Sequence, residues 1–417
     1  MCSFIDMANS ARTKNKDRRH FVGATPKTVR QLNKALVLDL IREHQPLSRA
    51  ELARLTGIHR SNISIIVEDL SEIGLIREER AKNFGRGRTP DLISFDRNAC
   101  RVMAVSLRRT HTTVVMAGLS GHVDNSFTFE TPEYPQQFAV AVGDAYRTLL
   151  QNASLMEANR APLRQAVVSI PGIVTRGSGD KAAIWTPGLP QYSGIDLTAM
   201  LQEQLKIPVL IANNAGLAAL SVIHDQEDKM PNDFVLLVVG DAGVGSGIVL
   251  QRSLYSGFDA AFAGEVGHTV VDPKGPPCNC GRVGCWQQYI CDEATWKRYK
   301  PGTSYSPAAF EEFLAAAESG SSKALSALRR TGEYLSLGIS NVALTFNPEQ
   351  IVLAGALMRV WPLLDKQLQS AFFLPHHHIL LKPLKAPIDT LYLRGAVEKA
   401  VSMVLSGSEQ TFSKKKE

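Results

Sequence analysis

The sequence of 417 residues contains no apolar run long enough to cross a membrane. Runs such as 234–239 are far shorter than the roughly 18–20 residues that a transmembrane helix needs. The basic residues near the N-terminus precede no apolar segment, which argues against a secretory signal. The sequence therefore predicts a cytoplasmic protein without a membrane anchor.

Cysteine is also scarce, and half of the six cysteines fall in one short segment at 278–285. This distribution does not supply a disulfide framework, and it fits a metal site in a reducing compartment. With His268 the pattern is His-x9-Cys-x-Cys-x4-Cys, and one imidazole with three thiolates is a common closed tetrahedral set for zinc. Free thiols in a glycine-rich loop are the alternative, and Cys291 is an alternative fourth ligand. We predict that a structural zinc ion is bound by His268, Cys278, Cys280 and Cys285.

Positive charge in excess is confined to the first quarter of the chain. Residues 1–95 hold 17 Lys and Arg against 11 Asp and Glu, which accounts for the whole net charge of +6 and leaves 29 of each sign in the remainder. This asymmetry predicts an N-terminal part that meets a polyanion and a neutral body with another task. A solubilising tail is the alternative. Residues 1–24, which include the basic cluster 12–19, are expected to form a disordered arm.

Residues 28–44 predict an amphipathic helix. Apolar residues recur there at helical spacing, and Pro46 ends the pattern. The residues expected on its buried face are Leu32, Leu36, Val37, Leu40 and Ile41.

Two further helices are predicted on either side of a glycine turn. Ser48 and Glu51 form a capping box for a helix to about Leu55, because each side chain can bond the other residue's backbone amide. Gly57 supplies the turn, and the third helix is expected over 59–73. Its buried face is expected to comprise Ile63, Ile66, Val67, Leu70 and Ile73.

This order of helices is typical of a DNA-binding helix-turn-helix, whose second helix lies in the major groove. Strands at 75–79 and 92–95, around a basic glycine-rich tip, predict a wing whose arginines enter an A·T-rich minor groove. A helical hairpin without a DNA role, and a flexible linker in place of the wing, are the alternatives. The candidate DNA-binding residues are Arg49, Arg60, Ser61, Asn62, Ser64, Arg86 and Arg88.

From about residue 100, short β-rich runs alternate with helical stretches, which predicts α/β layers with parallel strands. The strand candidates are 101–106, 113–118, 165–170, 209–212, 234–239, 247–250 and 350–353.

Motifs in this larger part resemble the ROK family of repressors, open reading frames and sugar kinases. They occur in the family's order and spacing, as Ser169–Val174, Ile211–Ala215, Gly240–Gly247, Gly264–His268, Cys278–Cys285, Asn347–Gly355 and Arg394–Ala396. With the helix-turn-helix, the resemblance is to the repressor branch of the xylose and N-acetylglucosamine repressor type. It covers nearly all of residues 25–405.

The resemblance implies an α/β fold in which a winged helix-turn-helix precedes a two-lobed actin/hexokinase-like (ribonuclease H-like) ATPase-type fold. It divides the chain into the arm 1–24, a DNA-binding domain and wing 25–95, and a sugar-kinase-like domain 96–417. The two lobes are expected to divide near 213–235, and the C-terminal helix is expected to return to the first lobe.

The same resemblance argues against an enzyme. Family kinases carry an Asp-Ile-Gly-Gly-Thr loop after the first strand, where this chain has Ser106–Thr110 and lacks the acid and both glycines. Their catalytic base is an Asp after an Asn, and here Asn214 cannot accept the sugar hydroxyl proton. We therefore expect no kinase activity.

Sugar binding is the chemistry that the resemblance leaves in place. Planar polar side chains offer paired donors and acceptors to neighbouring hydroxyls in a preformed cleft. Gln287 stands where the family has a second acid, so a different or weakly bound sugar, or a vestigial pocket, is an open alternative. The residues carried over from the family are Asn213, Asn214, Glu265, His268 and Gln287.

The sequence thus predicts a sugar-responsive DNA-binding transcriptional regulator, a repressor of carbohydrate uptake or catabolism genes. Its expected partners are a double-stranded operator, a sugar or sugar-phosphate effector and a second copy of the chain, as a homodimer or a dimer of dimers. A ROK sugar kinase and a repressor controlled by a protein partner are the alternatives. The histidine run 376–378 is expected to be an exposed loop and not a metal site.

Overall fold

The computed structural model describes residues 26–81, 89–151, 161–176, 182–225, 230–257, 263–369 and 379–407. The basic arm, Arg86 and Arg88 of the wing tip and the histidine run 376–378 lie outside these residues. None of the described helices is long and apolar enough to cross a membrane.

The N-terminal part is a winged helix-turn-helix, as predicted. A small antiparallel sheet in the order β1-β3-β2 completes the three helices. The elements are α1 (Pro26–His44), β1 (Leu47–Ser48), α2 (Arg49–Thr56), α3 (Arg60–Glu72), β2 (Ile76–Arg80) and β3 (Asp91–Phe95).

The turn between α2 and α3 forms for the reasons read from the sequence. Ser48 caps α2, accepting from the Glu51 amide while the Glu51 carboxylate accepts from the Ser48 amide. Gly57 adopts φ +71°, the left-handed conformation that a residue with a side chain resists. Four of the five apolar residues expected to face the core from α3 are fully buried, and Ile73 is partly buried.

The buried face of α1 differs from the prediction. Leu32 and Leu36 are 63% and 44% exposed, whereas Val37 and Ile41 are fully buried and Leu38 joins them. Only the C-terminal half of α1 contributes to the core shared with α2, α3 and the wing. The apolar side chains in the first half of α1 are therefore largely exposed among the described residues.

The first lobe is a five-stranded sheet in the order β10-β7-β4-β5-β6. Its outer face is covered by α4 (Pro135–Gln151) and α5 (Leu197–Leu205). The strands are β4 (Arg101–Leu107), β5 (His111–Gly118), β6 (Val123–Glu130), β7 (Leu163–Ile170) and β10 (Val209–Asn213), and a separate hairpin pairs β8 (Ile173–Arg176) with β9 (Ala182–Trp185).

The second lobe is another five-stranded sheet, in the order β13-β12-β11-β14-β15. Its strands are β11 (Phe234–Val239), β12 (Val244–Leu250), β13 (Ser253–Leu254), β14 (Gln350–Ala354) and β15 (Leu380–Pro383). Its outer helices are α7 (Gln287–Ile290), α8 (Asp292–Tyr299), α9 (Pro307–Glu318), α10 (Ser322–Phe346) and α11 (Trp361–Gln369).

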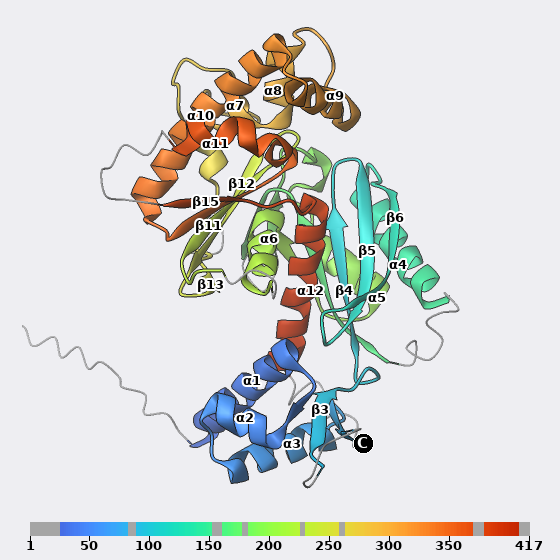
Figure 1. The fold of residues 1–417 in the computed structure, drawn as a ribbon. Coiled ribbons are helices and arrows are strands. Elements are labelled where there is room, and N and C mark those ends of the chain that lie inside the picture. The colour runs from blue at the N-terminus through green and yellow to red at the C-terminus, as the bar shows by residue number, and fades with distance from the viewer. Residues whose placement is uncertain are drawn as a thin grey trace, which may run out of the picture.

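Two helices lie between the sheets, as Figure 1 shows: α6 (Asn214–Ile223) and α12 (Ile388–Ser406). They pack so closely that a Cβ on Gly395 of α12 would come within 1.7 Å of the Leu217 carbonyl oxygen of α6. The far end of α12 reaches the DNA-binding domain, where Val401 and Val404 share one apolar core with Val37 of α1. One helix therefore touches the first sheet, α6 and the DNA-binding domain.

Candidate functional site

A cavity of about 230 Å³ lies where the two lobes meet. The loops after β4, β7 and β11 reach it, as do the junction of β10 with α6 and the first part of α12. It brings together all five residues predicted to contact a sugar, namely Asn213, Asn214, Glu265, His268 and Gln287.

Asn213 is held at the junction of β10 and α6 by both ends of its amide. Its Nδ2 donates to the Gly172 carbonyl oxygen at 2.8 Å, and its Oδ1 caps α6 by accepting from the Gly216 amide at 3.0 Å. Gly172 has φ +113°, and a Cβ there would lie 2.4 Å from the Trp185 carbonyl oxygen. The chain therefore needs glycine at this position to bring the β8–β9 hairpin against the cavity.

Asn214 and Gln287, which are expected from the sequence to stand where the family has acids, have different surroundings in the structure. Asn214 Oδ1 accepts from the adjacent Ala215 amide, at 2.9 Å. Gln287 is 8% exposed, donates from Nε2 to Cys278 Sγ at 3.4 Å and accepts at Oε1 from the Val244 amide at 3.4 Å. Gln287 thus links the cysteine loop to the start of β12, at Val244. Both the nitrogen and the oxygen of its side-chain amide are engaged in hydrogen bonds within the protein.

Glu265 and His268 face each other at the cavity wall, with 3.7 Å between Glu265 Oε2 and His268 Nε2. Burial raises the pKa of Glu265 to about 7. Burial, together with the charge of Arg282, lowers the pKa of His268, which favours the neutral imidazole that a metal requires.

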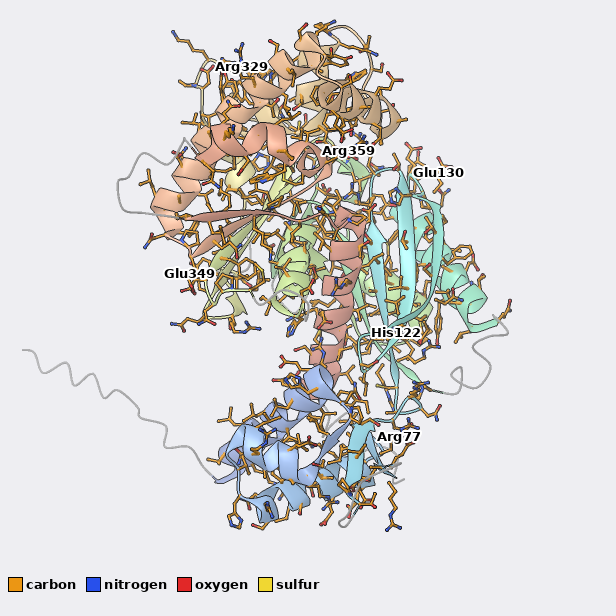
Figure 2. All side chains as sticks on the ribbon, in the orientation of Figure 1. Arg77, His122, Glu130, Arg329, Glu349 and Arg359 are labelled. Atoms are coloured by element: carbon orange, nitrogen blue, oxygen red, sulfur yellow. The ribbon has the colours of Figure 1, made fainter. Side chains whose placement is uncertain are left out.

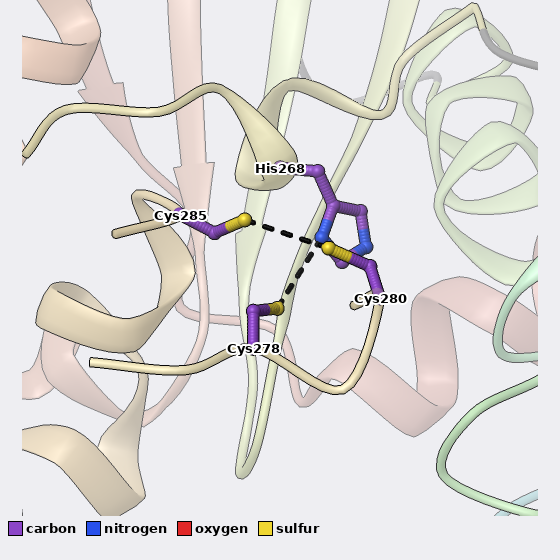
Figure 3. Close-up of side chains that lie close together, drawn as sticks. All are labelled: His268, Cys278, Cys280 and Cys285. Carbon is purple, nitrogen blue, oxygen red and sulfur yellow. Dashed lines mark hydrogen bonds between the residues drawn. The ribbon is translucent and has the colours of Figure 1, made fainter. Parts of the chain in front are cut away.

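The four predicted metal ligands converge, as Figure 3 shows. The ligand atoms of His268, Cys278, Cys280 and Cys285 all lie within 4.8 Å of one another. His268 presents Nδ1 to Cys278 Sγ at 3.6 Å, and Cys280 Sγ lies 3.5 Å from Cys285 Sγ. Cys291 is not part of this group. One imidazole and three thiols at these separations fit a tetrahedral metal ion, and His268 then has its other nitrogen facing Glu265 in the cavity.

Four charged or aromatic residues at the cavity were not identified from the sequence as functional: Arg108, Arg109, Asp241 and Tyr392. Arg108 follows β4, and its guanidinium lies near Asp241 of the second lobe and over the Tyr392 ring of α12. The sequence showed that Ser106–Thr110 lacks the kinase loop, but only the fold reveals what the arginine contacts.

The predicted recognition surface is exposed at the start of α3. Arg60, Ser61 and Asn62 are exposed and Ser64 is half-buried. Within the described residues, no side-chain hydrogen bond engages Arg60 or Asn62. Arg49 differs from them, because its guanidinium is bonded to Glu78 of β2 at 2.7 and 3.0 Å.

Two family descriptions match the chain. Residues 102–388 match the ROK family, and residues 27–87 match the MarR family. The xylose repressor of Bacillus spizizenii is 26% identical, over 82% of this chain and 86% of its own. The N-acetylglucosamine repressor of Escherichia coli O6:H1 is 27% identical, over 79% and 81% of the two chains.

A solved structure agrees in fold. It is a ROK family transcriptional regulator described as a homolog of the E. coli MLC protein, and it is 22% identical with a TM-score of 0.73 over 91% of this chain and 98% of its own. This likeness spans both the DNA-binding part and the two lobes, which confirms the predicted fold class. Because the match to 102–388 covers more than half of the sequence, the chain belongs to the ROK family.

Proposed function

We propose that this protein is a DNA-binding transcriptional repressor of carbohydrate genes whose operator affinity changes when a sugar or sugar phosphate binds between its lobes. The cavity that gathers all five predicted sugar-contacting residues, in a chain that also carries a winged helix-turn-helix, is the observation that carries the proposal. The relatives named for xylose and N-acetylglucosamine indicate the sugars to test first.

Operator recognition is assigned to α3. Its exposed N-terminal residues can reach base edges in the major groove, and Arg86 and Arg88 are proposed to reach the minor groove. We assign residues 25–95 to this domain and 96–417 to the sensor. A homodimer would present two such helices to a pseudo-palindromic site.

Phosphoryl transfer is not part of the proposed function. Arg108 stands after β4, where family kinases have a glycine-rich loop, and an arginine side chain cannot offer the closely approaching backbone amides that such a loop supplies. Asn214 stands in place of the catalytic acid and cannot accept a proton.

The metal is proposed to be a structural zinc ion held by His268, Cys278, Cys280 and Cys285. Four protein ligands leave no open position for hydrolytic chemistry. When bound, the metal would fix the His268 ring next to Glu265 and so order one wall of the cavity.

Selection of DNA from a random double-stranded library tests the DNA assignment. Wild-type protein should enrich one sequence, and a variant carrying Arg60→Ala and Asn62→Ala should bind it no more tightly than random DNA. Arg359→Ala is the matched control, because Arg359 lies in the second lobe, far from Arg77 of the wing (Figure 2). Undiminished preference in the double variant would refute the choice of α3.

Thermal unfolding with D-xylose, N-acetylglucosamine and their phosphates tests the sugar assignment, because a ligand that binds the native state raises its apparent stability. ADP release from ATP with the same sugars tests for kinase activity. We expect a thermal shift with at least one compound and no ADP release above that of a no-protein control; sustained turnover would favour the kinase alternative.

A further inference from the structure

Arg108 is a largely buried cation at the meeting point of three parts of the sensor. It follows the last residue of β4 in the first lobe, and its side chain is 16% exposed. Its Nη2 lies 3.5 Å from Asp241 Oδ2, and its Nε lies 3.4 Å from Asp389 Oδ1. The guanidinium carbon also lies 5.4 Å from the centre of the Tyr392 ring.

These partners belong to elements that are far apart in the sequence. Asp241 follows β11 of the second lobe and accepts a hydrogen bond from Tyr305 Oη at 3.2 Å. Asp389 and Tyr392 stand in the first turns of α12, and His111 of β5 lies 3.4 Å from the other Asp389 oxygen. Arg108 belongs to the first lobe, and its side chain thus contacts both the second lobe and α12.

The local charge explains why this cation is needed. Asp292 is 2% exposed at the start of α8, and burial together with the charge of Asp241 raises its pKa, while Arg108 acts in the opposite direction. Without Arg108, Asp241 and Asp389 would lose their shared positive partner beside this buried acid. The side chains of Asp241 and Asp389 are 39% and 40% exposed, so water would replace only part of what Arg108 supplies to them.

The other end of α12 touches the DNA-binding domain. Glu398 forms an ion pair with Arg42 of α1, and these side chains are 18% and 9% exposed. Val397, Ala400 and Val401 of α12 pack in the same core as Val37 of α1. A helix is stiff over this length, so the placement of its first turns bears on the position of its last ones.

We propose that Arg108 is the positioning residue that fastens α12 to both lobes at the cavity, so that the content of the cavity and the seating of the DNA-binding domain are linked through this helix. Because Arg108 lines the same cavity as Asn213 and Glu265, a molecule entering it meets the guanidinium that holds α12. The link to the content of the cavity rests on the proposed function, whereas the contacts assigned to Arg108 are those of the ligand-free protein.

Amide hydrogen exchange of the full-length, ligand-free protein tests this inference. Arg108→Ala should speed exchange in the first turns of α12, and in residues 37–44 of α1, by about tenfold, because local opening becomes easier. Arg109→Ala is the matched control, since the neighbouring Arg109 is exposed and is expected to leave both segments at wild-type rates. Wild-type exchange in α12 and α1 of a folded Arg108→Ala protein would overturn the proposal.

If Arg108→Ala does not fold, Asp389→Asn decides the question. This change removes the α12 carboxylate that faces both Arg108 and His111, so exchange should rise in α12 more than it does in a His111→Ala control, while β14 in the second lobe keeps its wild-type rates. Unchanged exchange in α12 would overturn the proposal. Neither measurement uses a sugar or DNA, so failure here is separate from failure of the proposed function.

Discussion

Arg49 at the start of α2 and Glu78 in β2 form a bidentate ion pair, with Arg49 Nη2 2.7 Å from Glu78 Oε1 and Arg49 Nε 3.0 Å from Glu78 Oε2. Both side chains are about one-quarter to one-third exposed, at 33% for Arg49 and 23% for Glu78. The pair joins the helix-turn-helix to the wing. Arg49, which is also one of the predicted DNA-binding residues, therefore has a positioning role within the domain in addition to any contact with DNA.

Arg49→Ala should lower the stability of the DNA-binding domain by about 1 kcal/mol, the upper end for partly exposed ion pairs, because this one is bidentate. The urea midpoint measured by circular dichroism checks this. Arg77→Ala is the control, since the pair of Arg77 with Glu79 is far more exposed, at 44% and 63%, and its loss should change little. Equal effects of the two changes would contradict the role given to Arg49.

Metal content should depend on the quartet of His268, Cys278, Cys280 and Cys285. We expect about one zinc ion per chain in purified wild-type protein, measured by elemental mass spectrometry, and a loss of most of it in Cys280→Ser because only three ligands remain. Cys291→Ala is the matched control, because Cys291 is buried but lies outside the cluster. Full zinc content in Cys280→Ser would show that the quartet is not the metal site.

Gly395→Ala should destabilise the protein by about 3 kcal/mol, at the upper end for overpacking, because the added methyl would collide with the backbone of α6. The collision is at the Leu217 carbonyl oxygen, 1.7 Å from the built Cβ. Thermal and urea unfolding measure the effect. Gly118→Ala is the control, since a Cβ there meets nothing within 4 Å. A neutral Gly395→Ala would mean that α6 and α12 are not held in contact.

Stability should fall on acidification because of His224, the residue after α6. Burial, with the nearby charges of Arg42 and Arg252, lowers the pKa of His224 from 6.5 to about 4. Between these pH values the unfolded chain binds a proton at His224 that the folded protein does not. The contribution of His224 to stability is therefore fully present above about pH 6.5 and is lost progressively towards pH 4. Unfolding midpoints of wild type and His224→Gln, compared from pH 7.5 to pH 5, should show a smaller loss in the variant. Identical pH profiles would contradict this assignment.

The sequence predicted those elements whose signals are local. The capping box at Ser48, the turn at Gly57 and the apolar face of α3 depend on neighbouring residues, and the structure has all three. The metal quartet was equally predictable, because three of its four ligands lie in one loop.

The features that the sequence did not reveal depend on contacts between distant segments. The sequence predicted a strand from residue 247, whereas β12 begins at Val244. The glycines of this strand are needed because they pack against α6: a Cβ on Gly247 would lie 2.3 Å from Ala219 Cβ. β6 was not predicted, since as an edge strand it is mostly exposed or half-buried and lacks a continuous apolar run. The partners of Arg108 are more than 100 residues away along the chain, so no local pattern could indicate them.

The most direct test of the proposed function is the affinity of the wild-type protein for its selected DNA, measured by fluorescence anisotropy with and without the sugar that raises its thermal stability. We expect that sugar to change the dissociation constant at least about fivefold, the lower end of typical coupling between two sites, and Asn214→Ala to abolish the change. A sugar that stabilises the protein yet leaves its DNA affinity unchanged would contradict the account.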